Sequence, residues 1–353
     1  MSRKNSGRSG KNNTLLKILC GVLAFVLVLM VGVTVYAEYL FGKIGKFDDN
    51  DTTLSQEEMD ALLQQEQEEI DPDATYETID PAEVTTAPPV DQQIGGEEHN
   101  IVNILLMGQD EAHGTVRSRT DSLILCTFNL EKKTLTMTSF MRDMYVEIPN
   151  FGGNRINVAY PWGGLEALDA TLMHNFGIHI DGHIAIDFSH FEELIDLLGG
   201  VDIELSSLEA GHLNSFYGFT LTEGMNHLNG AEALGYARIR KINTPDGSIA
   251  DFGRTNRQRI VLNALLMAYK DSGITQMLGL LDDVLPMVTT DMSYDQMTGY
   301  VMDYFPMLSD CTIVTQRIPA DGAYKLTMID GMSVLLPDLV KNRELLIDSL
   351  LDE

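Results

Sequence analysis

The feature that most constrains this chain is a run of twenty residues without a charge, Ile18 to Ala37. At about 1.5 Å per residue, a helix of this length spans roughly 30 Å, the thickness of the hydrocarbon core of a bilayer. Residues 1–17 carry five cations and no acid, and such a flank stays in the cytoplasm. We therefore predict a cytoplasmic basic tail at 1–17, a single transmembrane anchor at 18–40 and an extracellular remainder. A cleaved signal peptide is the alternative interpretation.

Acidic residues dominate the segment after the predicted anchor. Between Asp48 and Glu98 there are 17 acids, no lysine or arginine, and four prolines. Apolar residues are too sparse there to offset the entropy lost on folding. We predict that residues 41–99 form a largely disordered extracellular linker, in which LSQEEMDALLQQEQEEI has the spacing of a short helix.

Residues 100–353 have the alternating strand and helix patterns of a folded α/β domain. The predicted strands are IVNILLM, SLILCTFNL and TLTMTSF, the last two joined as a hairpin, followed by HIAIDF, VDIEL and CTIVTQRI. The predicted helices are ALDATLMHNFG, which ends at Gly177, SHFEELIDLLGG, AEALGYARIR, TNRQRIVLNALLMAY and a final helix from Leu336. Ser189 and Glu192 have the spacing of a capping box. Helices should cover both faces of the sheet.

Composition narrows the class of partner. The chain has 24 Lys and Arg against 52 Asp and Glu, a formal net charge of −28. A general nucleic-acid binder needs a basic face, so we predict no nucleic-acid partner. The cysteines lie among apolar neighbours, and we expect buried thiols. A disulfide between Cys126 and Cys311 is the alternative.

A quarter of the cations nevertheless lie between Arg238 and Arg259. Arg238 and Arg240 alternate, so they should point the same way from an extended or helix-ending stretch. Arg254 and Arg257 have i, i+3 spacing and should share one face of the first turn of a helix, with no acid between Arg254 and Arg259 to neutralise them. Because helix N-termini attract anions, this arrangement predicts a phosphate-binding site. Arg259 should be exposed. A solvated helix face is the alternative for the whole cluster.

Polar residues also collect at three strand ends. Asp110 follows the first strand, Arg119 and Asp121 open the second, and Arg142 and Asp143 follow the third. Carboxylate oxygens such as those of Asp110 and Asp121 are ligands that Mg²⁺ prefers, and it shares them with substrate phosphates. The arginines could hold such a phosphate. Ordinary surface ion pairs are the alternative interpretation.

Several motifs, taken in order, resemble the LytR–CpsA–Psr family across residues 102–265. They are MGQD, SRTDSLIL, SFMRDMYVEIP, RINVAY, DFSHFEELIDLLGGVDIEL, LNGAEALGYARIRK and DFGRTNRQR, and the later stretch DGMSVLLPDLVKN is similar too. The resemblance implies an α/β/α sandwich, with a central mixed sheet covered by helices on both faces and a tunnel for a lipid, as a catalytic domain at 100–353. It also implies a phosphotransferase that moves a glycopolymer, such as teichoic acid or capsule, from a polyprenyl-pyrophosphate carrier to peptidoglycan.

The resemblance also implies roles for single residues. Asp110 and Asp121 match metal-binding acids, for Mg²⁺ or Mn²⁺. The positions that match pyrophosphate binding are Arg119, Arg142, Arg238, Arg240, Arg254, Arg257 and Gln258. Among these residues we predict Arg142, Asp121 and Arg240 to be catalytic. Apolar runs near 185–201 and 260–285 could line the tunnel, although most of their side chains should be core.

Two other classes of function stay open from the residues. A hydrolase would split the pyrophosphate with water in place of the sugar hydroxyl. A non-catalytic protein would bind lipid-linked polymer as a sensor or scaffold.

Overall fold

The computed structural model describes most of the predicted folded domain and parts of the segments before it. The described residues are 39, 42–47, 54–55, 57–60, 76–84, 87–96, 101–109, 119–240, 242, 250–269, 283–308 and 310–351. The chain divides into two compact units, Met1–Ile44 and Gly45–Glu353, and the second contains the folded domain. The basic tail and nearly all of the predicted anchor lie outside the described residues. Among the described residues, no helix is long and apolar enough to cross a membrane.

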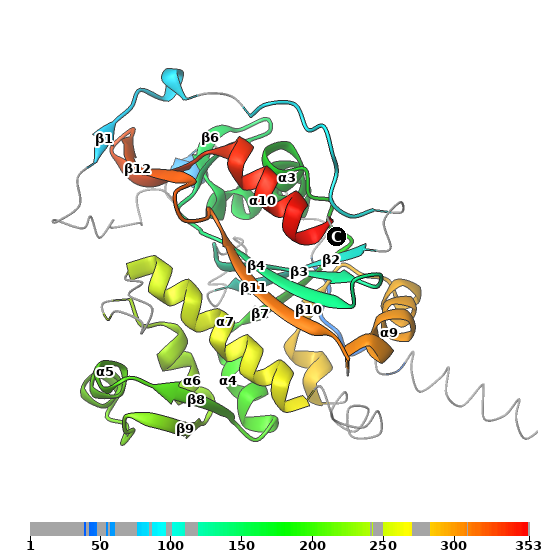
Figure 1. Ribbon diagram of the computed structural model, residues 1–353, viewed down its shortest axis with the longest axis vertical. Coiled ribbons are helices and arrows are strands. Elements are labelled where there is room, and N and C mark those ends of the chain that lie inside the picture. Colours follow the sequence, from blue (N-terminus) through cyan, green and yellow to red (C-terminus); the bar gives the residue numbers. More distant parts are fainter. Residues whose placement is uncertain are drawn as a thin grey trace, which may run out of the picture. The chain divides into compact units, whose positions relative to one another are not determined.

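Six strands form the central sheet. They are β2 (Ile101–Gln109), β3 (Thr120–Asn129), β4 (Thr134–Phe140), β7 (Gly182–Asp187), β10 (Thr289–Thr290) and β11 (Thr312–Ile318). Their order is β10-β7-β2-β3-β4-β11 (Figure 1). β2, β3 and β4 are antiparallel to one another in turn, whereas β7 and β11 run parallel to β2 and β4. The predicted mixed sheet and the hairpin within it are confirmed.

Helices cover both faces of this sheet (Figure 1). They are α3 (Ala159–Phe176), α4 (Phe188–Leu197), α5 (Ser207–Tyr217), α6 (Gly230–Ala237), α7 (Ala250–Tyr269), α9 (Tyr294–Leu308) and α10 (Leu339–Leu350). On β3, Leu123 and Leu125 pack in a core with α3 and α10. The alternate residues Ile124 and Cys126 pack against α7. Because successive side chains of a strand point to opposite faces of the sheet, β3 packs against the helices on both faces.

A second core lies beside the sheet and includes the predicted strand VDIEL. This strand, β8 (Val201–Leu205), pairs antiparallel with β9 (Gly224–Leu228) in a separate two-stranded sheet. Residues of α4, α5, α6 and α7 complete this core, in which Leu213 and Tyr236 are almost fully buried. The predicted strand is confirmed, but it does not extend the central sheet.

Three predicted boundaries are wrong. The N-cap of α4 is Asp187, whose carboxylate accepts from the backbone N–H of His190 at 2.8 Å, so Ser189 lies inside the helix. The final helix begins at Leu339, because Leu336 belongs to a strand. Helix α7 begins at Ala250, so Arg254 lies beyond its first turn.

Parts of the predicted linker are packed against the domain. Ile94 has no exposed surface, and Met59 belongs to the core beneath α3. The guanidinium of Arg343 donates to the carbonyl oxygens of Pro88 and Pro89 at 2.6 and 3.1 Å. These described segments of the predicted linker therefore pack against the domain, and α10 binds them through the carbonyl oxygens of Pro88 and Pro89.

Further short elements complete the unit. They are β1 (Glu77–Thr78), β5 (Tyr145–Ile148), β6 (Gly152–Arg155), β12 (Tyr324–Ile329), β13 (Met332–Pro337) and the 3-10 turns η1 (Pro81–Glu83), η2 (Ile156–Val158) and η3 (Leu285–Met287). β5 pairs with β6, and β12 pairs with both β1 and β13. No disulfide joins Cys126 and Cys311, so that alternative is excluded.

Candidate functional site

A cavity of about 590 Å³ lies between the central sheet and helices α4, α6 and α7. This volume is within the range of ligand-binding pockets. Much of its wall is apolar and comes from all of these elements: Leu106, Met107, Ile124, Ile186, Phe188, Phe191, Leu234, Ala237 and Leu262. Of the apolar runs 185–201 and 260–285 proposed to line a tunnel, Ile186, Phe188, Phe191 and Leu262 reach the cavity. Ile195, Val201 and Val261 are core.

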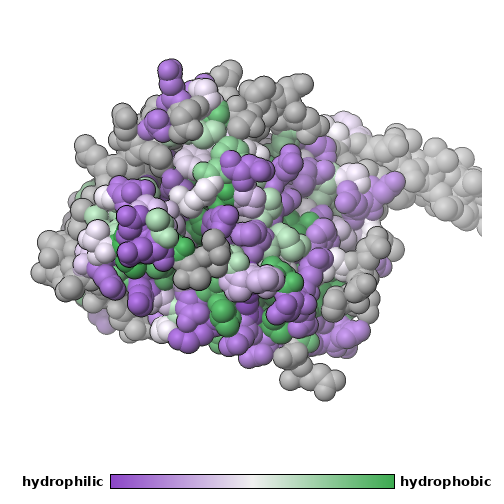
Figure 2. All heavy atoms as spheres, turned by 90° about the horizontal axis from the view of Figure 1, so that it is seen from above, coloured by the Kyte–Doolittle hydropathy of each residue, from purple (hydrophilic) through white to green (hydrophobic). Residues whose placement is uncertain are grey.

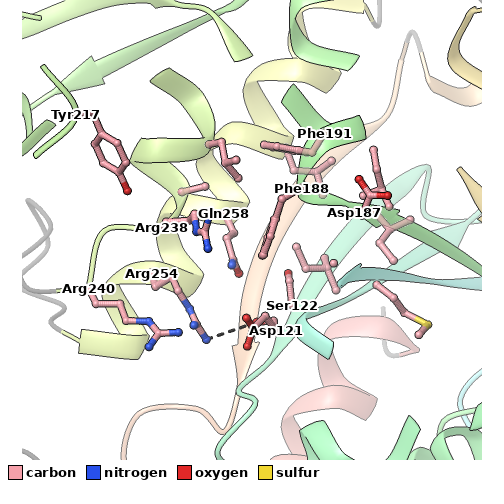
Figure 3. A pocket seen from close by; sticks show the side chains of 18 residues that line it. Asp121, Ser122, Asp187, Phe188, Phe191, Tyr217, Arg238, Arg240, Arg254 and Gln258 are labelled. Carbon is pink, nitrogen blue, oxygen red and sulfur yellow. Dashed lines mark hydrogen bonds between the residues drawn. The ribbon is translucent and has the colours of Figure 1, made fainter. Parts of the chain in front are cut away.

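The polar part of the wall gathers several of the predicted site residues. Figure 3 shows Arg240, Arg254 and Asp121 close together at one side of the cavity, with Arg238 and Gln258 beside them. Residues far apart in the sequence, at the start of β3, the end of α6 and within α7, therefore form one site. The arrangement is amphiphilic, with cations and a carboxylate at one end of an apolar hollow.

Local backbone geometry explains why Arg238 and Arg240 face the cavity together. α6 ends at Ala237, and Arg238 is its C-cap. Ile239 is 2% exposed and packs in the second core, so the arginines on either side point the other way. The guanidinium of Arg238 lies 4.6 Å above the ring of Phe188. Arg240 lines the cavity, and among the described residues it forms no ion pair, although its charge acts on Asp121 and Asp143.

Arg254 is held by acids at the edge of the cavity. Its guanidinium pairs with Asp251, one turn earlier in α7, and donates to the carbonyl oxygen of Asp121 at 3.5 Å. Arg142 donates to the carboxylate of Asp121 at 2.8 Å and lies 3.5 Å from Asp251. No acid lies within the stretch 254–259, but acids from outside it neutralise part of the cluster.

The charges in this network shift one another's pKa values. Burial opposes ionisation of Asp121, but Arg142 and Arg254 outweigh it, and the pKa of Asp121 lies below its usual value. Burial and the neighbouring Asp251 raise the pKa of Asp143 to about 6, although Arg142 opposes the shift. Asp121 is therefore an ionised carboxylate near neutral pH, whereas Asp143 begins to take up a proton just below it.

Arg257 does not share the site of Arg254. Its side chain is completely buried, and its Nε donates to Oε1 of Glu209 at 2.8 Å. Its other nitrogens donate to the carbonyl oxygens of Ile239 and Ile242 at 3.1 and 2.8 Å. The expected common face therefore does not form, and Arg257 connects α7 to α5 and to the backbone that carries the cavity arginines.

Other predicted residues lie outside the cavity wall or outside the described residues. Arg142 does not line the cavity itself, but it donates to Asp121, which does. Arg119, just before β3, is not part of the lining either. Asp110 lies outside the described residues, which contain no group of three or more His, Cys, Asp or Glu able to hold a metal. Arg259 is only 9% exposed and donates to the carbonyl oxygen of Gln316 at 3.2 Å, so the prediction of an exposed cation is wrong.

Comparison with known proteins agrees with the motifs. A model of the LytR_cpsA_psr family matches residues 56–345, most of the chain. This chain belongs to that family. The regulatory protein MsrR of Staphylococcus aureus (strain COL) is 40% identical over 166 residues, which are 46% of this chain and 48% of MsrR. The chain thus spans about half the length of that relative.

Two further relatives of this LytR–CpsA–Psr protein extend the comparison. The polyisoprenyl-teichoic acid–peptidoglycan teichoic acid transferase TagU of Bacillus mycoides (strain KBAB4) is 29% identical over 253 residues, 71% of this chain and 70% of TagU. TagT bound to LI-WTA has a TM-score of 0.58 and 24% identity, covering 75% of this chain and 99% of TagT. TagT with bound octaprenyl pyrophosphate lipid has a TM-score of 0.54 and 23% identity over the same shares. These structures share the mixed α/β fold.

Sequence reasoning missed several residues of this family member's site. Asp251 bridges Arg142 and Arg254, and both of its carboxylate oxygens are buried. Its i, i+3 spacing from Arg254 would have identified the pair. Phe188 and Tyr217 line the cavity, but no local pattern separates them from core or surface aromatics.

Proposed function

We propose that this protein is a phosphotransferase that moves an anionic glycopolymer from a polyprenyl-pyrophosphate carrier to a hydroxyl of peptidoglycan, forming a phosphodiester. The observation that carries the proposal is the amphiphilic cavity, in which arginines and a carboxylate stand at one end of an apolar hollow. A polyprenyl pyrophosphate has the matching chemistry, with a concentrated anion on a long apolar chain. Family membership and the name of TagU point to the same class of donor and acceptor.

The proposed chemistry is displacement at phosphorus. The sugar hydroxyl attacks the phosphorus that carries the polymer, its proton is lost to a base, and polyprenyl phosphate leaves with the electrons of the broken phosphoanhydride bond. Such a reaction needs positioning and charge stabilisation rather than covalent protein chemistry. Arg238 and Arg240 would bind the pyrophosphate, since both face the cavity, and Arg254 would meet its far edge. Gln258, one turn after Arg254, would donate to a phosphate oxygen.

The fixed ion pairs would keep the remaining cations in place during the reaction. Arg142 is oriented by Asp121 and Asp251, so its charge is positioned before substrate binds. Preorganised charges stabilise a transition state without reorganisation at the moment of reaction. Arg142, Asp121 and Arg240 stay our proposed catalytic residues. Asp251 is a candidate for the base, because its carboxylate lies beside Arg142 and Arg254 at the edge of the site.

A divalent cation would fit one part of this site. Asp121 is an ionised carboxylate at the cavity wall, and Mg²⁺ characteristically uses one or two carboxylates together with water and substrate phosphate oxygens. Asp121, with Asp110 as the proposed second ligand, would hold Mg²⁺ or Mn²⁺. The bound cation would neutralise charge on the pyrophosphate.

The proposed location follows from the acceptor. Peptidoglycan lies outside the cell membrane, so the domain would act there, attached by the predicted N-terminal anchor. A hydrolase with water as the nucleophile and a non-catalytic binder of lipid-linked polymer are the competing functions.

One reconstitution separates these functions. The purified full chain is incubated with lipid-linked donor and peptidoglycan fragments, with Mg²⁺ or with EDTA, and the products are identified by mass spectrometry. We expect a polymer–peptidoglycan phosphodiester and free polyprenyl phosphate, both lost with EDTA and in Asp121→Asn. Polymer phosphate released without peptidoglycan would indicate a hydrolase, and tight donor binding without turnover would indicate a binding protein. Asp121→Asn with full activity and an unchanged response to EDTA would refute the metal site.

A further inference from the structure

Helix α5 presents large hydrophobic side chains to solvent. Leu208 is 64% exposed, Phe216 is 75% exposed and Tyr217, the last residue of the helix, is 46% exposed. Leu208 and Phe216 are separated by two helical turns, with His212 between them, so they lie along one face. We call Leu208, His212, Phe216 and Tyr217 the α5 face.

The α5 face carries no formal charge other than any on His212. Glu209 is the one Asp, Glu, Lys or Arg in α5, and it has no exposed surface because it pairs with Arg257. In a chain with 22% charged residues and a net charge of −28, an exposed helix face without an acid or a lysine is unusual. The face that Figure 2 shows differs, because hydrophilic side chains there surround scattered hydrophobic ones.

Aromatic rings connect the α5 face to the cavity. The ring of Phe216 lies 5.3 Å from that of His212 and 5.7 Å from that of Tyr217, and Tyr217 stacks on Phe219 at 5.4 Å. Tyr217 also lines the cavity, on the side away from Asp121 (Figure 3). Gly235 of α6 allows this approach, since a Cβ there would lie 3.3–3.4 Å from Leu213, Phe219 and Tyr217. The exposed face is therefore continuous with the end of the cavity remote from the carboxylate.

We propose that the α5 face docks on the surface of a lipid bilayer, so that the apolar chain of the carrier passes from the bilayer into the cavity beside Tyr217. The proposal rests on the proposed function, because it assumes a lipid in the cavity. Phe216 and Leu208 would lie among the upper acyl chains, and Tyr217 at the level of the headgroups, where its ring and hydroxyl both find partners.

Charge argues against an anionic partner. Residues 201–237 contain five acids and no lysine or arginine, so neither anionic lipid nor an anionic polymer would be attracted to this region. Docking must then come from burial of apolar area, which salt does not screen. We expect docking to be independent of ionic strength and to occur on zwitterionic phosphatidylcholine.

Tryptophan fluorescence of the full chain tests the contact. The chain has one tryptophan, Trp162, which is 5% exposed and provides a constant background. We compare Phe216→Trp with the control Leu345→Trp, whose site on α10 is 44% exposed but has the charged neighbour Glu344. Both variants are reconstituted into phosphatidylcholine vesicles, with and without lipids brominated on the acyl chains. We expect bromolipid to quench the added emission of Phe216→Trp in low and high salt, and to leave that of Leu345→Trp unchanged.

Other outcomes would overturn the proposal. Emission from Phe216→Trp that is typical of water and insensitive to bromolipid would mean that the face is not in the bilayer. A blue shift that follows protein concentration instead of lipid would mean that a second copy of this chain covers the face. Quenching that disappears in high salt would mean that electrostatics, not apolar burial, hold the domain at the surface.

A second measurement separates docking from the proposed function. Phe216→Ser should bind a water-soluble short-chain prenyl pyrophosphate as the wild type does, because Phe216 does not line the cavity. Its turnover of carrier embedded in vesicles should fall about tenfold, the effect of withdrawing one large apolar side chain from lipid. Unchanged turnover would refute docking by this face. Failure of the wild type to bind any prenyl pyrophosphate would refute the proposed function and leave the quenching result to decide docking alone.

Discussion

Replacing Arg257 should destabilise the fold instead of selectively weakening ligand binding. Arg257 and Glu209 are both fully buried, and the guanidinium donates one hydrogen bond to the carboxylate and two to main-chain carbonyls. Removing one partner of such a pair leaves an uncompensated buried charge, which costs about 3–5 kcal/mol. With an unfolding entropy of about 2.1 cal/mol/K per residue and roughly 250 residues unfolding together, Arg257→Met should lower the melting temperature by roughly 6–10 °C.

The assay is thermal unfolding of the wild type, Arg257→Met and the double variant with Glu209→Gln. The other oxygen of Glu209 accepts from the backbone N–H and the hydroxyl of Ser206, and a glutamine can keep these bonds while losing the charge. The double variant should therefore recover about 1–2 kcal/mol relative to Arg257→Met, because the unpaired charge is gone. An unchanged melting temperature for Arg257→Met, with lost affinity for a prenyl pyrophosphate, would refute this account. It would indicate that Arg257 binds the anion directly.

Three further predictions concern the arginine site and the core. Arg240→Ala should weaken binding of a prenyl pyrophosphate about ten- to a hundredfold in calorimetry at an unchanged melting temperature, because its guanidinium faces the cavity. Arg259→Ala should lower the free energy of unfolding in urea by about 1 kcal/mol, because it removes a buried hydrogen bond; a change below about 0.2 kcal/mol would restore the exposed cation. Burial opposes the charge of His183, but bonds of 2.8 Å to Asp169 and Asp291 raise its pKa to about 9. Its contribution of about 3 kcal/mol should be complete below about pH 6.5 and decline as the pH approaches 9, and urea unfolding of His183→Asn should lack this decline.

The sheet was predictable because its strands are buried on both faces. IVNILLM and SLILCTFNL are apolar in consecutive positions, and this pattern is typical of strands between two helical layers. The sheet that a strand joins was harder to predict. VDIEL has the alternation of a half-buried strand, which indicates a strand but not the sheet to which it belongs. The hairpin around Asp330 and Gly331 was missed although both residues have positive φ and Asp-Gly is a strong turn signal.

The site was predictable where alternation fixed direction. Arg238 and Arg240 flank the buried Ile239, so their common orientation followed from the strand-like spacing. The prediction that Arg254 and Arg257 share the anion site was wrong. Their i, i+3 spacing indicates a common face of the helix but not what packs against that face. Arg257 is turned toward the second core, where it pairs with Glu209 of a different helix. A partner 48 residues away leaves no local pattern.

The acids around the arginines suggest that some of the cations bind the anion and others stabilise charge during the reaction. An incoming pyrophosphate must compete with Asp251 and Asp121 for Arg142 and Arg254, so the gain in binding at these positions is reduced by the ion pairs it replaces. Arg240 forms no ion pair among the described residues and acts on Asp121 and Asp143 only through its charge, so it loses less when it binds the anion. The paired arginines instead keep fixed positions, and fixed charges are most useful where charge develops during the reaction. Affinity should therefore depend chiefly on Arg240, and turnover on Arg142.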